Sequence, residues 1–154
     1  MREIDVLVVG AGPGGMSAAQ YAARAGYSTL VLDPMGPGGQ LLFIDEIENY
    51  PGLGKISGYF LSESMENQCK EFGVEIEYDE VKKIEKKDNR FLVTSSYSEI
   101  KAKAVIIATG ASHRHIGAKG EEEYSGKGVS YCATCDGPFF RGQKVVVVGG
   151  GDTA

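Results

Sequence analysis

The stretch Val6-Leu-Val-Val-Gly-Ala-Gly-Pro-Gly-Gly15 decides the fold predicted for this chain. The continuous apolar run from Ile4 to Val9 is typical of a strand buried on both faces of a parallel sheet. A helical pattern over Pro13 to Arg24 follows, and Gly10-x-Gly12-x-x-Gly15 lies at the junction. In such a turn the first glycine allows the tight bend, the second lets the backbone approach a pyrophosphate, and the third lets helix and strand pack closely. The pyrophosphate would lie at the helix N-terminus.

The residues after the helix strengthen this prediction. Gly26 ends the helix, a second strand is expected over Ser28 to Leu32, and Asp33 follows it. Asp33 comes about 20 residues after the glycine turn, where an acidic side chain accepts hydrogen bonds from a ribose. A glycine pattern alone is weak evidence, but strand, helix, strand and acidic residue in this order predict dinucleotide binding.

Further elements complete the predicted α/β domain. The stretch from Pro34 to Leu53 is rich in Gly and Pro and is expected to be a functional loop. Ser57 is expected to cap a helix that ends near Phe72 and packs the thiol of Cys69 in its apolar face. The remaining strands are predicted at Val74–Tyr78, Val81–Glu85, Arg90–Ser95, Glu99–Lys103 and Ala104–Ala108, with the second to fourth forming an antiparallel meander and the last returning to the main sheet.

The motif Cys132-Ala-Thr-Cys135-Asp136-Gly137 carries the most reactive chemistry in the sequence. Cysteines spaced as Cys-x-x-Cys are redox-active thiols or metal ligands. For disulfide exchange one cysteine must be accessible as a thiolate while the other faces the electron donor. Asp136 is placed to carry the proton that the exchange releases, although an Asp-Gly turn before Pro138 is the alternative interpretation.

A zinc half-site is the rival interpretation of the two cysteines. His113 and His115 would complete a set of four ligands with Cys132 and Cys135. The order His-x-His followed by Cys-x-x-Cys is not a usual zinc-module spacing, so the prediction is that no metal binds. The histidines are expected to be solvated.

A second glycine turn lies at the end of the sequence. Lys144 to Val148 is expected to form a strand, and Gly149-x-Gly151-x-x-Ala154 repeats the first fingerprint with alanine in the third position, a permitted variant. Two nucleotide-binding turns therefore flank the cysteine pair.

Composition limits the classes of partner. The net charge of -5 argues against nucleic acid and anionic membranes, because both need clustered Lys and Arg. No apolar run approaches the roughly 18 residues of a membrane span, and Glu3 and Asp5 are unlike the basic start of a signal peptide. A soluble, cytoplasmic protein is expected.

The combined motifs resemble the N-terminal half of a bacterial-type, low-molecular-weight thioredoxin reductase. The resemblance covers essentially all 154 residues and rests on Gly10–Gly15, Gly38-Gly-Gln-Leu41, Glu48-Asn-Tyr-Pro-Gly52, Ile107-Ala-Thr-Gly-Ala111, Cys132–Gly137 and Gly149–Ala154. It implies a Rossmann-like, three-layer FAD-binding domain with an antiparallel meander, whose first segment is residues 1–114. It also implies that residues 115–154 begin an inserted NADPH-binding domain, with the NADPH site incomplete in this chain.

The resemblance also implies roles for individual residues. Cys135 would face the flavin and Cys132 would attack the thioredoxin disulfide. Because the cysteine pair and the NADPH turn must reach one flavin in turn, a hinge is predicted over Ala111 to Gly120. The full-length protein is expected to be a homodimer that passes electrons from NADPH through FAD to thioredoxin, and the alternative is a truncated, inactive FAD-binding or interaction fragment. The residues expected to contact FAD are Gly10, Ala11, Gly12, Pro13, Gly14, Gly15, Asp33, Gly38, Gly39, Gln40, Asn49, Val81, Thr109 and Gly110, and those expected to contact NADPH are Gly149 and Gly151.

Overall fold

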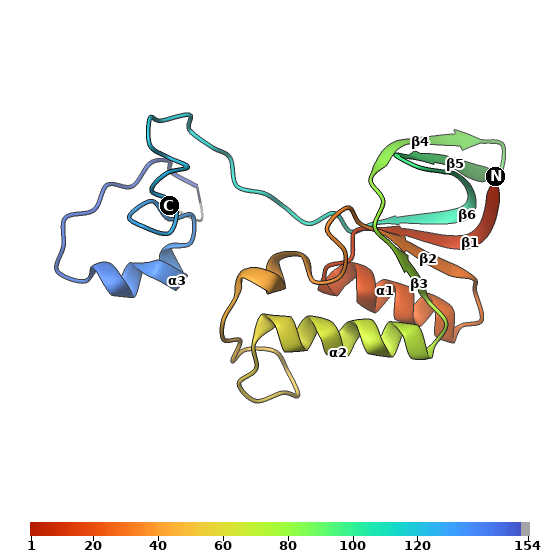
Figure 1. The fold of residues 1–154 in the computed structure, drawn as a ribbon, viewed down its shortest axis with the longest axis horizontal. Helices are drawn as coiled ribbons and strands as arrows, with labels where there is room; N and C mark the ends of the chain where they lie inside the picture. The colour runs from red at the N-terminus through yellow and green to blue at the C-terminus, as the bar shows by residue number, and fades with distance from the viewer. Residues whose placement is uncertain (152–154) are drawn as a thin grey trace. The chain divides into compact units, whose positions relative to one another are not determined.

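The chain divides into two compact units, Met1–Gly110 and Ala111–Ala154, which are described separately (Figure 1). The computed structural model describes residues 1–151, apart from the side chain of Cys135. Within the residues that it describes, no helix is both long and apolar enough to cross a membrane.

The first unit is built on one six-stranded sheet with strand order β3-β2-β1-β6-β5-β4. Strands β3, β2, β1 and β6 run parallel, and β6, β5 and β4 are antiparallel neighbours. This is the predicted combination of a parallel sheet and a meander. The strands are β1 (Arg2–Val9), β2 (Thr29–Leu32), β3 (Glu75–Glu77), β4 (Val81–Lys87), β5 (Arg90–Ser95) and β6 (Glu99–Ile107).

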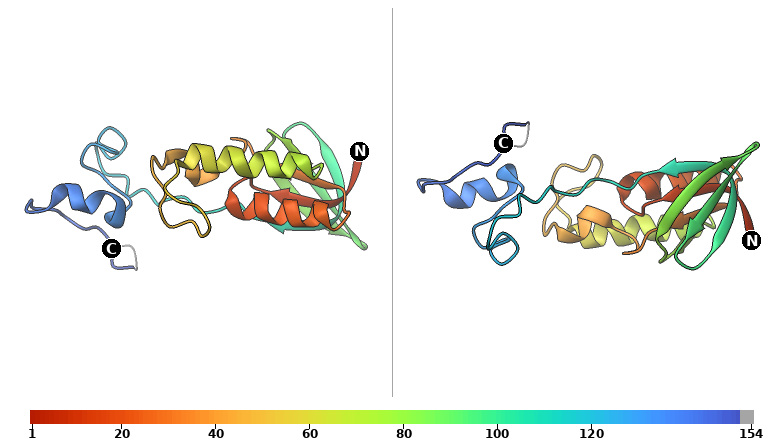
Figure 2. Two further views of the ribbon diagram at one scale, coloured as in Figure 1. Left: turned by 90° about the horizontal axis from the view of Figure 1, so that it is seen from below. Right: turned by 90° about the horizontal axis from the view of Figure 1, so that it is seen from above.

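Two helices, α1 (Pro13–Arg24) and α2 (Gly58–Glu71), lie side by side on one face of the parallel strands (Figure 2). The Ser57 side chain caps α2 by accepting a hydrogen bond of 3.2 Å from the Phe60 N–H, as predicted. Cys69 is buried and its Sγ donates to the Met16 carbonyl at 3.3 Å, which confirms a packed thiol. The apolar residues between helices and sheet include Val6, Val8, Met16, Ala19, Val31, Leu61, Met65 and Cys69.

The opposite face of the parallel strands is covered by the meander. Leu7, Leu30 and Leu32 from the parallel strands pack with Val93 and Ile100 in a second apolar cluster. Helices, parallel strands and meander therefore form three layers (Figure 1), and the predicted fold class is confirmed.

Some strand boundaries and the loop after Asp33 differ from the predictions for this unit. The expected strands Glu99–Lys103 and Ala104–Ala108 are one strand, β6, because Glu99–Ala102 pairs with β5 on one edge while Ile100–Ile107 pairs with β1 on the other. The extended backbone therefore needs no break between the meander and the parallel sheet. The loop after Asp33 is also less irregular than expected, since it contains a 3-10 helix, η1 (Gly39–Phe43).

The second unit contains α3 (Ala133–Asp136), η2 (Gly137–Phe140) and an isolated bridge between Ser125 and Val129. The predicted strand Lys144–Val148 is wrong, because these residues have no regular structure and Val146 is 90% exposed. A strand is defined by ladder hydrogen bonds, and this apolar segment pairs with no neighbour among the described residues. The last predicted position of the second glycine turn, Ala154, lies outside the described residues.

Candidate functional site

The glycine turn lies where the carboxyl ends of β1 and β6 meet. Gly10 has φ +105°, and a Cβ atom there would lie 2.3 Å from the Ala108 carbonyl oxygen. A Cβ atom on Gly15 would lie 1.9 Å from the Gly10 carbonyl oxygen. Both glycines are therefore required by the packing of turn, helix and neighbouring strand, as the fingerprint predicted.

Gly12 and Gly14 have a different environment from Gly10 and Gly15. A Cβ atom on either would have no neighbour within 4 Å, so the backbone of the turn faces open space there. Gly12 is the N-cap of α1, and no side chain caps that helix end. The first N–H groups of an α-helix lack intrahelical partners, and the helix dipole favours an anion beside them. This helix end fits a pyrophosphate.

Asp33 holds the turn from the end of β2. Its Oδ2 accepts a hydrogen bond of 2.8 Å from the Ala11 N–H, and its Oδ1 accepts one of 2.8 Å from the Met35 N–H. The acidic residue therefore connects the glycine turn with the loop after β2. A carboxylate has about four lone-pair positions, so the two N–H groups leave acceptor capacity for a ribose.

The loop after β2 closes on the glycine turn. The Gly38 N–H donates to the Ala11 carbonyl at 2.9 Å, and a Cβ atom on Gly39 would lie 3.2 Å from Gly12 Cα. Sequence reasoning assigned Gly38 and Gly39 to the same cofactor without predicting this direct contact. Gln40 follows them and is exposed.

The other predicted residues of the first unit lie on three different segments. Thr109 and Gly110 follow β6, and the nearby Ala108 N–H donates to the Val9 carbonyl at 2.8 Å. Val81 packs against the same apolar cluster as Val9, and Val9 is the last residue of β1. Asn49 is exposed in its loop, and among the described contacts none joins it to the glycine turn.

In the second unit, Cys132 lies directly before α3. Its N–H donates to Ser130 Oγ at 3.1 Å, and its carbonyl accepts from the Asp136 N–H at 3.0 Å. Its Sγ lies 3.4 Å from Thr134 Oγ1. The helical turn thus brings the backbones of Cys132 and Asp136 together, while the side chain of Cys135 lies outside the described part of the structure.

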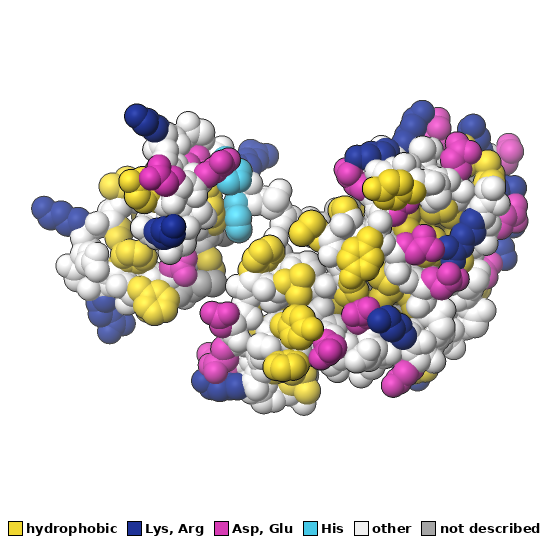
Figure 3. Space-filling model, viewed as in Figure 1, with side chains coloured by type: hydrophobic (Ala, Val, Ile, Leu, Met, Phe, Trp, Pro, Cys, Tyr) yellow, Lys and Arg dark blue, Asp and Glu magenta, His cyan; other side chains and the backbone are white. Residues whose placement is uncertain are grey.

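The two histidines are exposed, as expected, but they are not free side chains. The His113 ring stacks on Tyr131 with centroids 4.7 Å apart, and His115 Nδ1 lies 3.1 Å from the Tyr131 hydroxyl (Figure 3, cyan). Within the described residues, no group of three or more His, Cys, Asp or Glu side chains is arranged to hold a metal ion. The hydrogen-bonded pair Glu121 and Tyr131 was not predicted from the sequence. A run of three glutamates, 121–123, is typical of a solvated surface and gives no sign that one of them is buried.

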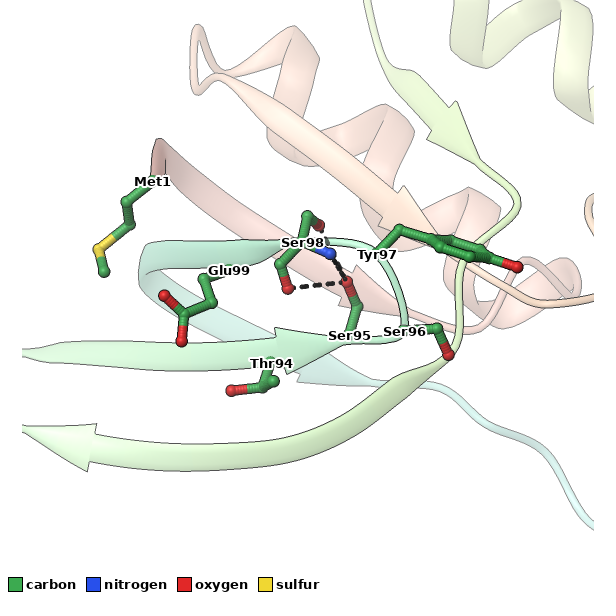
Figure 4. A pocket seen from close by; sticks show the side chains of 7 residues that line it. All are labelled: Met1, Thr94, Ser95, Ser96, Tyr97, Ser98 and Glu99. Atoms are coloured by element: carbon green, nitrogen blue, oxygen red, sulfur yellow. Dashed lines mark hydrogen bonds between the residues drawn. The ribbon is translucent and has the colours of Figure 1, made fainter.

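A shallow hollow of about 380 Å³ lies elsewhere on the first unit. Its lining comes from Met1 and Thr94–Glu99 (Figure 4). Met1 precedes β1 and Glu99 begins β6, so the hollow lies at the amino ends of these strands, opposite the glycine turn. It is not part of the candidate cofactor site.

The glycine turn, the uncapped helix end and the acidic residue after β2 define the class of dinucleotide-binding α/β proteins. Residues 4–154 match the family model described as pyridine nucleotide-disulphide oxidoreductase, and the chain belongs to this family. Membership implies FAD and NADPH as cofactors, and the open turn beside α1 fits the phosphates of FAD.

Similar proteins include several thioredoxin reductases. The one from Treponema pallidum is 54% identical over 99% of this chain and 50% of its own length. The structure of the Lactococcus lactis enzyme in its FR conformation matches with a TM-score of 0.76 at 47% identity, over 90% of this chain and 46% of that one. The structure of the thioredoxin reductase from Streptococcus pyogenes matches with a TM-score of 0.78 at 47% identity, over 90% of this chain and 45% of that one. The chain thus spans about half the length of the relatives it matches, and it corresponds to their N-terminal half.

Proposed function

We propose that the protein carrying this sequence is an FAD-dependent thioredoxin-disulfide reductase that takes its electrons from NADPH. The observation that carries the proposal is the 54% identity over 99% of the chain to a thioredoxin reductase, in a chain that retains both Cys132 and Cys135. Thioredoxin is the proposed partner, the cytoplasm the proposed compartment and a homodimer the proposed assembly.

The first segment of the FAD-binding domain is proposed to be residues 1–114, and residues 115–154 are proposed to begin the NADPH-binding domain. The division of the structure after Gly110 supports a boundary in this region. The segment from Ala111 to Gly120 is the proposed hinge, since the cysteine pair and the nicotinamide must reach one flavin in turn.

The chain's own residues would hold FAD at the carboxyl edge of the parallel strands. The N–H groups at the start of α1 would bind the pyrophosphate, and the spare acceptor positions of Asp33 would bind the adenosine ribose. Gln40 and Asn49 are assigned to the flavin side, and Val81, Thr109 and Gly110 to the adenine and phosphate region. When bound, FAD would supply the transfer of two electrons from NADPH to a protein disulfide.

The cysteine pair would carry those two electrons to thioredoxin. Cys132, as a thiolate, attacks one sulfur of the thioredoxin disulfide, so that a mixed disulfide forms and one thioredoxin thiolate leaves. Cys135 then attacks the Cys132 sulfur, which releases the second thioredoxin thiolate and restores the Cys132–Cys135 disulfide. Thioredoxin gains two electrons and two protons in total.

Asp136 is the proposed proton carrier for the departing thiolates. The helical turn supports this role, because the Asp136 N–H is bonded to the Cys132 carbonyl and its carboxyl group therefore belongs to the same turn as the thiol. A carboxyl within reach of a sulfur can transfer a proton directly or through one water molecule.

The test is NADPH consumption by the natural protein in the presence of oxidised thioredoxin. The proposal expects turnover that requires both thioredoxin and NADPH, and a loss of at least about 100-fold in Asp136→Asn, the low end for a general acid-base group. A protein that consumes NADPH at the same rate without thioredoxin would contradict the proposal. Asp88, exposed in the turn between β4 and β5, provides the matched Asp→Asn control.

A further inference from the structure

Glu121 is the only buried residue among the described side chains of the second unit, with 6% of its surface exposed. A buried charge is destabilising unless it is paired and hydrogen-bonded. A buried carboxylate in a unit whose described apolar side chains are not buried therefore requires a structural or functional explanation.

The carboxylate of Glu121 accepts hydrogen bonds from a loop of the backbone. The Ile116 N–H donates to Oε1 at 3.0 Å, and the N–H groups of Gly117 and Ala118 donate to Oε2 at 2.7 and 3.2 Å. Oε1 also accepts from the Tyr131 hydroxyl at 2.8 Å. Although burial acts to raise it, these four donors hold the pKa of Glu121 below its ordinary value. The group is thus an anion around which the loop and Tyr131 are arranged.

Tyr131 is held on several sides. Its ring lies parallel to His113 within 6°, and the ring of His115 meets it edge-on at 5.5 Å. Burial, followed by the hydrogen bond to Glu121, raises the pKa of Tyr131, so its hydroxyl stays protonated at neutral pH and remains a donor. His115 Nδ1 also lies 3.4 Å from Glu121 Oε1.

The anchored tyrosine directly precedes the reactive cysteine. The carbonyl of Cys132 accepts the first hydrogen bond of the α3 turn, from the Asp136 N–H, and the Cys132 N–H is held by Ser130 Oγ. The residue bonded to Glu121 is therefore covalently adjacent to the residue whose carbonyl begins that turn. The Tyr131 hydroxyl, through its bond to Glu121 Oε1, joins the cysteine segment to the loop that binds this carboxylate.

We propose that Glu121 and Tyr131 are positioning residues for Cys132, which hold the cysteine segment in the turn where Cys132 and Cys135 form their disulfide. The proposal rests on the redox role of the pair given above. It assigns no contact between Glu121 and the reacting sulfur atoms, because Glu121 acts through Tyr131.

The physical reason is effective concentration. Two thiols held in one geometry form a disulfide more readily than two thiols on a freer chain. In the exchange with glutathione, the Cys132 and Cys135 thiols lose two electrons and two protons and become a disulfide, while oxidised glutathione becomes two thiols. Removing the anchor of Tyr131 lowers the equilibrium constant for this oxidation.

The test measures that equilibrium constant for residues 1–154 in glutathione buffers, by mass spectrometry of the alkylated Cys132–Cys135 peptide, which separates the pair from Cys69. The variants are Tyr131→Phe, which removes the hydroxyl and retains the ring, Glu121→Gln, which removes the charge and retains the size, and the double variant. Glu123→Gln is the matched control, because it removes the same charge from an exposed residue two positions away. The parent protein unfolded in guanidinium gives the equilibrium constant for a cysteine pair that no folded contact holds in place.

Each single variant is expected to lower the constant by about 3- to 10-fold, the range of one net hydrogen bond. The double variant is expected to lower it by less than the product of the two single effects, because both changes weaken the contact between Tyr131 and Glu121. Glu123→Gln is expected to match the parent. Parent-like values in either single variant, multiplied effects in the double variant, or a fall to the value in guanidinium would each overturn the proposal. The measurement contains neither thioredoxin nor FAD, so a protein that fails to reduce thioredoxin would overturn the proposed function without altering this result.

Discussion

The Asp33 carboxylate accepts a hydrogen bond of 2.8 Å from the Ala11 N–H, and this bond joins the end of β2 to the glycine turn after β1. The same carboxylate accepts the Met35 N–H, so one side chain orders both segments that would surround the phosphates. The acidic residue thus has a role in the fold that is independent of any contact with a ribose.

Replacing Asp33 with Ala is expected to lower the free energy of unfolding by about 1.5 to 3 kcal/mol, the range for a hydrogen bond to a charged group. Asp33→Asn is expected to lower it less, because the amide oxygen retains one acceptor. Urea unfolding followed by circular dichroism measures both, with Asp45→Ala as an exposed control. Equal stability of parent and Asp33→Ala would show that the bond contributes nothing.

The glycines of the turn should separate into two kinds. Gly15→Ala places a Cβ atom 1.9 Å from the Gly10 carbonyl oxygen, so the backbone must shift and the unfolding free energy should fall. Gly12→Ala meets no protein atom within 4 Å and should leave stability within about 1 kcal/mol of the parent, the usual scale of a Gly/Ala difference.

The same Gly12→Ala variant tests the cofactor site. If the open side of Gly12 faces the pyrophosphate, the new methyl group should weaken FAD binding by at least about tenfold, since each 1.4 kcal/mol of lost contact corresponds to that factor. Fluorescence titration with FAD measures the dissociation constant, and Gly26→Asn, at a helix end with φ +86°, is a control away from the turn. Unchanged FAD affinity in Gly12→Ala would place the phosphates elsewhere.

The free energy of unfolding at acid pH should depend on Asp5. Hydrogen bonds from Lys103 and then from Ser28 lower the pKa of Asp5 from its ordinary value of 3.8 to about 2. A carboxyl with a depressed folded-state pKa contributes stability above its unfolded pKa and loses that contribution as the pH falls through the folded value. Stability attributable to Asp5 should therefore be lost between about pH 4 and about pH 2.

The comparison is between the parent and Asp5→Asn, with urea midpoints measured at intervals of pH. The parent should lose stability more steeply than Asp5→Asn across that acid interval, and Asp45→Asn should behave as the parent does. Parallel curves for the parent and Asp5→Asn would mean that the bonds to Lys103 and Ser28 do not persist in solution.

Features set by neighbouring residues could be predicted from the sequence. The helix from Pro13 to Arg24 matches the prediction at both ends, and the Ser57 cap was predicted because an N-cap depends on residues within one turn. The glycine turn was predicted from its fingerprint, and the glycine at position 15 is needed because of a near neighbour in sequence, the Gly10 carbonyl.

Features that depend on distant partners could not be predicted in this way. The continuous strand β6 has two different neighbours on its two edges, and no local pattern reports which edge is paired. The apolar run at Lys144–Val148 has strand composition, yet a strand forms only beside a partner. The burial of Glu121 depends on Tyr131, ten residues away, and on a loop that folds back around the carboxylate.

The roles assigned to Cys132, Cys135 and Asp136 stay predictions. The division of roles between the two cysteines can be tested by replacing each cysteine separately. Cys132→Ser should leave the Cys135 thiolate to interact with oxidised flavin and give a broad long-wavelength absorption band in the natural protein. Cys135→Ser should lack that band while its Cys132 remains open to alkylation. The opposite pattern would exchange the two roles.

The most direct test of the central claim is an anaerobic titration of the natural protein with NADPH, followed by addition of oxidised thioredoxin while the visible flavin absorption is recorded. The account predicts that NADPH bleaches the flavin bands in the parent and in Cys132→Ser alike. It further predicts that thioredoxin restores the bands in the parent but not in Cys132→Ser. A colourless protein, a parent whose bands stay bleached after thioredoxin is added, or a Cys132→Ser variant that recovers as fast as the parent would contradict the claim.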